Sequence, residues 1–255
     1  MTSYRIIPCL LLEHGNLVKT VKFKDPKYIG DPINAVKIFN DKGVDELIML
    51  DTTATIDGTR PNLKKIADIV SEAFMPIGYG GGINDIDDIQ QLLALGIEKI
   101  SLNSVAAENP GFVSKAAELA GSQSIVVSIE VKKGFLGKYE VWTHSGRDKT
   151  SFEPVAFAKL MEQHGAGEIF LNSIDRDGTM SGYDLALVQK VASAVKIPII
   201  ACGGAGQVSD FESAITEAGA SAVAAGSLFV FHGPHRAVLI SYPVQQDAFQ
   251  APTIK

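Results

Sequence analysis

Two glycine-rich turns stand about half a chain apart, each at the end of an apolar run. The first is the Gly-Gly-Gly-Ile run at residues 80–83, and the second is Gly-Gly-Ala-Gly at residues 203–206. Other segments repeat in the same order at a similar offset: residues 43–50 match 165–172, and residues 95–104 match 218–227. Ordered repeats indicate a chain of two similar halves. We place them at about residues 1–123 and 124–255.

Short runs rich in Ile, Val and Leu alternate with longer stretches of helical period. The predicted strands are residues 5–11, 46–51, 76–80, 98–103, 124–130, 168–173, 197–202 and 221–226. The predicted helices are residues 32–42, 63–74, 86–95, 111–120, 152–164, 185–195, 208–218 and 234–241. Eight strand–helix units in 255 residues predict an α/β protein with a single closed (β/α)₈ barrel, a fold of roughly 250 residues. An open doubly wound sheet is the alternative, but the half-repeat fits closure better.

Two features complicate this pattern. Pro8 lies inside the first predicted strand, where it removes a ladder donor, so we expect a bulge or local irregularity there. Residues 12–30 and 131–151 are predicted as long loops, with a small hairpin over residues 138–144. Both loops follow strands and therefore belong to the face where barrel enzymes carry their chemistry.

Composition excludes several classes of protein. A net charge of -6 with dispersed Lys and Arg argues against nucleic acid as a partner. No segment approaches the ~20 uninterrupted apolar residues of a membrane span, and the first residues have no signal-peptide pattern. Cys9 and Cys202 are too few for a disulfide framework, and residues 175–178 lack the glycine and glutamate of a calcium loop. We expect a soluble cytoplasmic protein without metal or cofactor.

The strand ends supply two candidate phosphate sites. The first group is Gly81, Gly82, Asn103 and Ser104, and the second is Gly203, Gly204, Gly226 and Ser227, with Gly178 assigned to the same sites. Backbone amides of glycine turns, short hydroxyls and helix N-termini together favour a phosphate dianion. The alternative is that these glycines only allow tight turns. Two groups at symmetric positions favour an elongated ligand with a phosphate at each end.

Several motifs together resemble the HisF family, the cyclase subunits of imidazole glycerol phosphate synthase in histidine biosynthesis. They are residues 5–10 (Arg-Ile-Ile-Pro-Cys-Leu), 80–83, 173–179 (Ser-Ile-Asp-Arg-Asp-Gly-Thr) with 181–184, and 199–206. The resemblance extends to about Phe231. It implies a (β/α)₈ barrel, a phosphorylated small-molecule substrate with two phosphates, and a separate HisH-like glutaminase that feeds ammonia through the barrel.

The chain departs from this family at the catalytic positions. The resemblance implies two aspartates as general acid and base, where this sequence has Leu11 and Glu130. Leucine carries no proton, and the longer Glu130 displaces its oxygens, a change that can cost ~10²-fold. General acid–base catalysis contributes about 10² to 10⁴-fold, so we expect weak or absent cyclase activity. Lys19 is retained in the diverged segment after the first strand. Asp51, Asp175 or Asp177 are the acids that a working cyclase would recruit.

Four charged residues begin predicted strands: Arg5, Glu46, Lys99 and Glu168. The resemblance implies that they form a salt-bridged gate through which ammonia enters the amino-terminal face of the barrel, where the glutaminase docks. The alternative is a set of solvated charges. Ile7, Cys9 and Leu11 share the parity of Arg5 and should line the interior above it.

Residues 229–243 resemble a HisF-like subgroup associated with surface-polysaccharide sugars, which works with a glutaminase and a separate amidotransferase to convert an acetamido into an acetamidino group. The chain has no glutaminase of its own, because neither cysteine lies in a nucleophile-type turn with a partnered histidine. Our first hypothesis is an ammonia-delivering subunit of this kind. The second is an authentic cyclase. A related single-chain sugar-phosphate isomerase is less favoured, because it also needs acids at both substituted positions and has no use for a gate.

Overall fold

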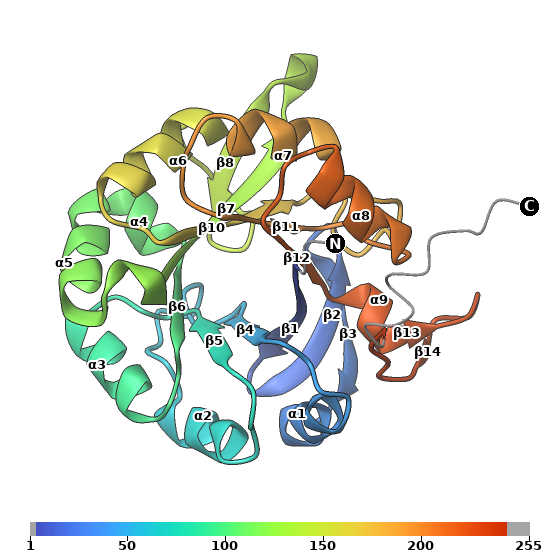
Figure 1. Cartoon of the computed structure of the whole chain (residues 1–255). Helices are drawn as coiled ribbons and strands as arrows, with labels where there is room; N and C mark the ends of the chain where they lie inside the picture. Colours follow the sequence, from blue (N-terminus) through green and yellow to red (C-terminus); the bar gives the residue numbers. More distant parts are fainter. Residues whose placement is uncertain (1–3, 244–255) are drawn as a thin grey trace, which may run out of the picture.

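Eight parallel strands form a closed barrel in the computed structural model, which describes residues 4–243 (Figure 1). The strands are β1 Arg5–Glu13, β4 Leu47–Asp51, β5 Ile77–Gly80, β6 Lys99–Leu102, β7 Ile125–Lys133, β10 Glu168–Ser173, β11 Ile199–Cys202 and β12 Ala222–Ala225. They follow one another around the ring in chain order, and the pairing of β7 with β10 completes it. The predicted (β/α)₈ barrel is confirmed.

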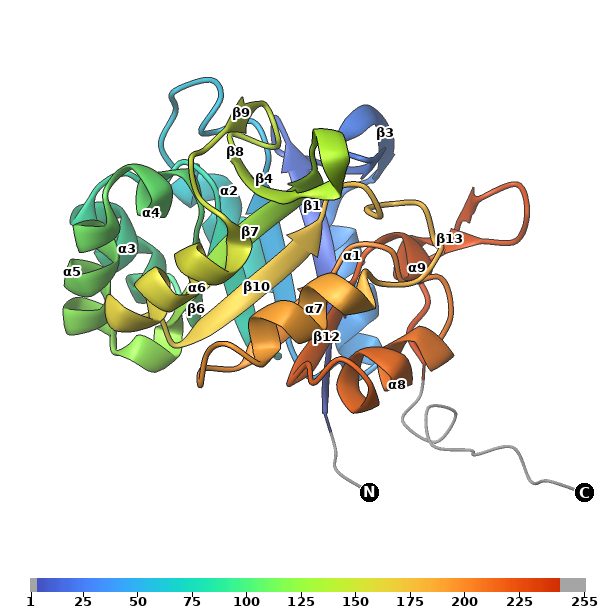
Figure 2. The ribbon, with the colours of Figure 1, turned by 90° about the horizontal axis from the view of Figure 1, so that it is seen from above.

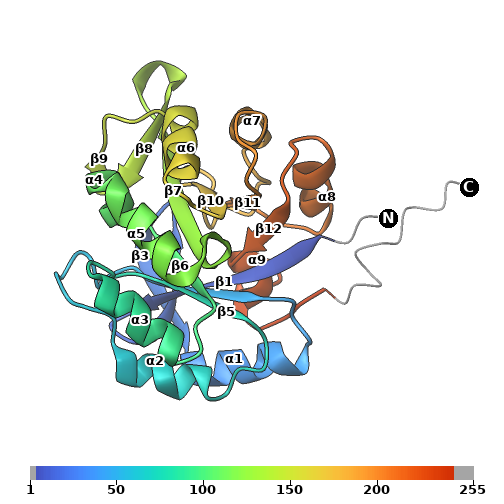
Figure 3. The same ribbon diagram turned by 60° about the vertical axis from the view of Figure 1, so that its left-hand side comes forward.

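Helices surround the strands on the outside (Figure 3). They are α1 Pro32–Asp41, α2 Leu63–Val70, α3 Ile86–Ala94, α4 Ser104–Glu108, α5 Pro110–Ala120, α6 Pro154–Gln163, α7 Leu185–Ala192, α8 Ser209–Thr216 and α9 Ser227–Val230, with short 3₁₀ turns at Ser122–Ser124 and Phe135–Gly137. Helix α1 shows why they form: the Asp31 carboxylate accepts hydrogen bonds from the amides of Ile33 and Asn34, and proline occupies the first turn. Its apolar face, with Val36 and Phe39, is buried against the barrel.

Alternation along each strand divides the apolar residues into two layers. One layer packs between the strands and the helices. The other fills the barrel interior and contains Ile7, Ile48, Val126, Phe170 and Ile200. The alternation along each strand thus decides which residues face the interior, including the residues at the two ends of the barrel.

The prediction of long loops at residues 12–30 and 131–151 is wrong in part, because both segments contain strands. Strand β1 continues to Glu13 and pairs with β2 Asn16–Val21, which pairs with β3 Lys24–Gly30. Strand β7 continues to Lys133 and pairs antiparallel with β8 Tyr139–Thr143, followed by β9 Asp148–Lys149. Residues 138–144 are therefore mainly the returning strand of a larger hairpin. Strands that extend beyond the barrel satisfy their backbone groups with these antiparallel partners.

The predicted helix at residues 234–241 is also wrong. Strands β13 Phe231–His232 and β14 Ala237–Val238 form a small hairpin there, turning at Gly233, whose φ is 70°. Tyr242 then packs on Phe229 with ring centroids 5.5 Å apart and donates a hydrogen bond to the Ile6 carbonyl. A glycine–proline pair favours a turn over a helix.

The bulge expected at Pro8 is absent from β1, whose register with its neighbours is continuous. Residues 5–8 of β1 pair with β12, whereas residues 9–12 pair with β4. Pro8 therefore lies at the point along β1 where pairing passes from one neighbouring strand to the other. Figure 2 shows the start of β1 on the side opposite to β3, β8 and β9. Within residues 4–243, no helix is both long and apolar enough to cross a membrane.

Candidate functional site

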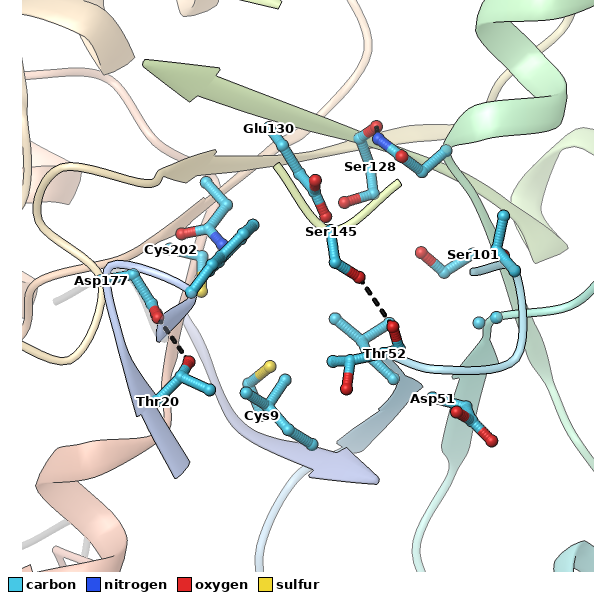
Figure 4. Close-up of a pocket in the computed structure, with 18 of the residues that line it drawn as sticks. Cys9, Thr20, Asp51, Thr52, Ser101, Ser128, Glu130, Ser145, Asp177 and Cys202 are labelled. Atoms are coloured by element: carbon cyan, nitrogen blue, oxygen red, sulfur yellow. Dashed lines mark hydrogen bonds between the residues drawn. The ribbon is translucent and has the colours of Figure 1, made fainter. Parts of the chain in front are cut away.

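A pocket opens at the carboxyl ends of the barrel strands (Figure 4). We call it the C-terminal pocket. It is lined by the predicted catalytic positions Leu11, Lys19, Asp51, Glu130 and Asp177, and by all nine predicted phosphate-site residues, Gly81, Gly82, Asn103, Ser104, Gly178, Gly203, Gly204, Gly226 and Ser227. Asp175 is not among the lining residues, and one of its oxygens accepts a hydrogen bond from the Lys133 amide. The fold thus brings together residues from all parts of the sequence.

Two carboxyl groups in the C-terminal pocket have raised pKa values. Burial, aided by the charge of Asp177, raises the pKa of Glu130 to about 8, although a hydrogen bond from the Gly146 amide opposes the shift. Burial also raises the pKa of Asp177 to about 6, against the charge of Lys19 and a hydrogen bond from Thr20. At neutral pH, therefore, Glu130 holds a proton and Asp177 is ionised. Leu11 contributes only apolar surface beside them.

Lys19 and Asp51 are committed to local contacts. Lys19 is buried on β2, and its Nζ donates a hydrogen bond to the Cys9 carbonyl at 2.5 Å. One oxygen of Asp51 accepts three hydrogen bonds from Thr53 and Ala54, which fixes the turn after β4. Asp51 therefore shapes the pocket wall. Asp177 accepts a side-chain hydrogen bond from Thr20 alone among the described residues, so it is less constrained than Asp51.

The glycines of the predicted phosphate sites are required by the fold itself. Gly81 and Gly204 have φ of 115° and 116°, and a Cβ at either would overlap the backbone of Asp51 or Gly182. Such positions accept only glycine. Their presence is thus explained by close packing, and an anion site must be argued from the amides and hydroxyls that surround them.

The four charged residues at the strand starts meet at the opposite end of the barrel. Arg5 bridges two carboxylates, with Nη1 2.6 Å from Glu46 and Nη2 2.7 Å from Glu168. Lys99 Nζ lies 3.5 Å from Glu168 Oε2 but donates its hydrogen bond to the Gln123 carbonyl at 2.7 Å. We call these four residues the charge cluster. Burial raises the pKa of Glu46 despite the opposing charge of Arg5.

Several polar residues that line the C-terminal pocket were not predicted from the sequence. Ser101 and Ser128 project into the pocket from β6 and β7, and Ser145 donates a hydrogen bond to the Thr52 carbonyl (Figure 4). Asn172 lines the same pocket from β10. Ser101, Ser128 and Asn172 could have been predicted, because each lies at a position of a predicted strand whose side chain faces the barrel interior. Among residues 4–243, no group of three His, Cys, Asp or Glu side chains is placed to hold a metal ion.

A pocket at the carboxyl ends of the strands, lined by acids, hydroxyls and glycine turns, defines a (β/α)₈-barrel protein with a small-molecule site. A family model described as "Histidine biosynthesis protein" matches residues 5–235. The chain belongs to the HisF family of imidazole glycerol phosphate synthase subunits.

Individual relatives agree with this assignment. A Pseudomonas aeruginosa protein provisionally named subunit hisF2 of imidazole glycerol phosphate synthase is 52% identical over 95% of this chain and 97% of its own length. A Leptospira borgpetersenii protein provisionally named subunit HisF is 50% identical over 97% of this chain and 98% of its own. Imidazole glycerol phosphate synthase subunit HisF of Alkaliphilus metalliredigens is 44% identical over 91% of this chain and 92% of its own.

The buried Glu130 should make stability depend on pH. Because its pKa is about 8 in the folded chain and about 4.3 unfolded, the folded state binds the proton more tightly, and Glu130 destabilises the fold as pH rises between these values. Glu130→Gln should therefore be more stable than wild type above about pH 8, and the difference should vanish near about pH 4.3. Urea unfolding across this range measures it. Glu153→Gln, at an exposed position, is the control, and an equal pH profile for Glu130→Gln and wild type would contradict the burial argument.

Proposed function

We propose that this chain is the synthase subunit of a glutamine-dependent amidotransferase complex. It receives ammonia from a separate HisH-type glutaminase and delivers it through the barrel to a phosphorylated ligand in the C-terminal pocket. The observation that carries the proposal is the charge cluster of Arg5, Glu46, Lys99 and Glu168.

The charge cluster is a poor device for stability alone. The carboxylates of Glu46 and Glu168 are largely buried, and buried ion pairs are often no more stabilising than apolar residues of the same volume. Lys99 is the member with the longest ion pair, and its hydrogen bond goes to a backbone carbonyl outside the cluster. A plug of ion pairs with one weakly attached member is suited to open and close a passage.

The layer above the cluster favours ammonia over ammonium. Ile7, Ile48, Val126, Phe170 and Ile200 make this part of the interior apolar, and an unpaired charge would lose its hydration there. Only the neutral molecule can cross such a layer at low cost. The glutaminase must then dock at the amino-terminal face, because ammonia released into water would be protonated.

The C-terminal pocket supports a ligand with phosphate groups. Ser104 begins α4 and Ser227 begins α9, and both lie beside the glycine turns on opposite sides of the pocket. Hydroxyls and exposed amides at helix starts are ordinary phosphate partners. The final ammonia acceptor that we propose is an acetamido sugar, converted to its acetamidino form with a further amidotransferase. Two features support it: residues 229–243 resemble the subgroup associated with such sugars, and Leu11 leaves the cyclase reaction without one of its acids.

Loss of one charge should uncouple the complex. Lys99→Ala leaves two acids against one base, so we expect ammonia to leak at the mouth and glutamate released per amidated product to rise several-fold. The ratio is measured in a complex reconstituted with a HisH-type glutaminase and an acetamido-sugar amidotransferase. Lys115→Ala, exposed on α5, is the control. An unchanged ratio in an intact complex would mean that the four charges have no gating role.

Both phosphate sites should bind inorganic anions. Crystals grown with sulfate should contain one anion near Gly82 and Ser104 and one near Gly204 and Ser227. Ser104→Ala should weaken the first site alone and Ser227→Ala the second, as judged by occupancy at equal sulfate concentration. If both sites are empty in the wild-type crystals, the glycines serve only the turns.

An authentic cyclase is the second candidate, and one observation favours it. Glu130 and Asp177 differ in pKa, so one is protonated and the other ionised at neutral pH. A pair of groups with separated pKa values is the usual basis of general acid–base catalysis. Asp177 could take the proton-transfer role that Leu11 cannot fill.

A cyclase assay of the isolated chain with ammonium salt separates the two candidates. Our proposal predicts a kcat/KM lower by ~10²-fold or more than that of the Alkaliphilus HisF subunit, because one acid is missing. Leu11→Asp should recover part of the difference. A wild-type rate within about tenfold of that subunit would favour the second candidate, since proton transfer alone accounts for at least 10²-fold.

A further inference from the structure

A second cavity lies outside the barrel ring, between the carboxyl ends of β1, β4 and β5 and the start of α2. Its volume is about 370 Å³, which is within the range of small-molecule pockets. We call it the lateral cavity. Leu12 and Ile66 give it an apolar wall that belongs to the layer between strands and helices. Asp51 and Thr53 line both this cavity and the C-terminal pocket, so the turn after β4 separates the two.

The lateral cavity contains a buried hydroxyl without a partner. The Tyr79 side chain on β5 is only 1% exposed and lines the cavity, and its hydroxyl makes no hydrogen bond within residues 4–243. By contrast, the buried Tyr183 donates its hydroxyl to the Ala224 carbonyl. Buried tyrosine hydroxyls normally have a partner, so the Tyr79 hydroxyl is placed for a ligand that enters the cavity.

The surroundings of Tyr79 favour a positively charged group. Burial, and then the charges of Asp51 and Asp88, raise the pKa of Tyr79, so its hydroxyl keeps its proton and has two carboxylates nearby. Asp51 Oδ1 accepts the hydrogen bonds of the turn after β4, whereas Oδ2 accepts none from the described residues. Figure 4 shows the Asp51 carboxylate directed away from Glu130 and Cys9. The inner part of the lateral cavity thus offers oxygen acceptors to a cation.

Hydrogen-bond donors lie nearer to solvent. Lys65 Nζ is 3.6 Å from Asp31 Oδ2, which is longer than a hydrogen bond, so its N–H groups stay available. Arg60 Nε donates to Asp88 Oδ1 at 2.7 Å, but its Nη groups donate to none of the described residues. Asn62 caps α2 with its oxygen and keeps its amide N–H groups. Donors of this kind bind a carboxylate.

The formal charges of the lateral cavity balance. Asp51 and Asp57 are offset by Arg60 and Lys65, and the remaining titratable group, besides Tyr79, is His14, whose Nδ1 lies 3.7 Å from Asp57. Such a cavity disfavours a phosphate dianion. Since acceptors lie inside and donors outside, it favours a small molecule that carries one charge of each sign.

We propose that the lateral cavity binds a free α-amino acid as its zwitterion. The ammonium group lies against the Tyr79 hydroxyl oxygen and Asp51 Oδ2, and the carboxylate lies against Lys65 Nζ. Leu12 and Ile66 contact the side chain of the amino acid. The site neither receives nor supplies ammonia, so it goes beyond the proposed function and does not depend on it.

The test uses the full chain and amino acids as probes. The standard L-amino acids are screened one by one at millimolar concentration by saturation-transfer NMR, and the strongest is titrated by calorimetry. Its primary amide lacks the carboxylate, and its N-acetyl derivative lacks the ammonium group. We expect saturable binding of the amino acid and at least about tenfold weaker binding of each derivative, because each loses charge-assisted hydrogen bonds. Inorganic phosphate and glycerol serve as probes for an anion site and a polyol site.

Three variants locate the bound amino acid. Tyr79→Phe should weaken binding by about tenfold, the loss of one hydrogen bond to a charged group. Its thermal midpoint without ligand should not fall, because the hydroxyl has no protein partner to lose. Lys65→Ala should also weaken binding by at least about tenfold. Lys64→Ala, which removes the same charge from an exposed position in the same turn of α2, should leave binding unchanged.

Several results would overturn the proposal. Absence of binding by every amino acid would do so, as would equal binding of the N-acetyl derivative or tighter binding of phosphate, either of which indicates an anion site. Tighter binding of glycerol would indicate a polyol site. Unchanged affinity in Tyr79→Phe or in Lys65→Ala would place the amino acid elsewhere, for example in the C-terminal pocket.

Discussion

The pairing of β7 with β10 closes the barrel, and the remaining features of the molecule depend on it. The parallel register runs from Glu168 opposite Val126 to Ser173 opposite Val131. It converts a row of strands into a ring with an inside and an outside. Each strand then contributes alternate side chains to a shared interior, so a residue's parity decides whether it packs under a helix or faces the axis.

The interior is layered along the barrel axis as a result. Charged residues occupy the amino ends of the strands, apolar residues the middle, and hydroxyl, thiol, amide and carboxyl groups the carboxyl ends. Strand β10 contributes to all three layers through Glu168, Phe170 and Asn172. This order places a charged plug, a barrier to ions and a set of hydrogen-bonding groups in sequence along one line, which is the physical basis of the conduit that we propose.

Electrostatics in the C-terminal pocket follow from burial more than from any single partner. Asp177 lies close enough to Glu130 that its charge raises the pKa of Glu130. At Asp177 the charge of Lys19 lowers the pKa and so opposes the effect of burial. Two carboxyl groups in one pocket are thus held in different protonation states by their surroundings. The pocket keeps acid–base chemistry available although Leu11 offers none.

The sequence by itself determined the local features of this protein. Hydrophobic periodicity located the eight barrel strands, and Asp31 and Pro32 mark the start of α1 because capping is a local interaction. The recurring glycines located the turns at the strand ends. The family resemblance added the four strand-start charges, and their mutual distances in the structure agree with a cluster.

Only the tertiary structure decided what depends on distant partners. Strands β2 and β3 escaped prediction, and β8 was predicted only as part of a smaller hairpin, because these strands pair with extensions of β1 and β7 beyond the barrel. Residues 234–241 have a helix-compatible composition, but they form a hairpin whose following residue, Tyr242, packs on Phe229 and bonds to β1. The neighbourhood of Asn172 and Glu130 exists only once the ring is closed. Periodicity reports which face of a strand is buried, whereas the side chains that meet there are fixed by the register between strands far apart in the chain.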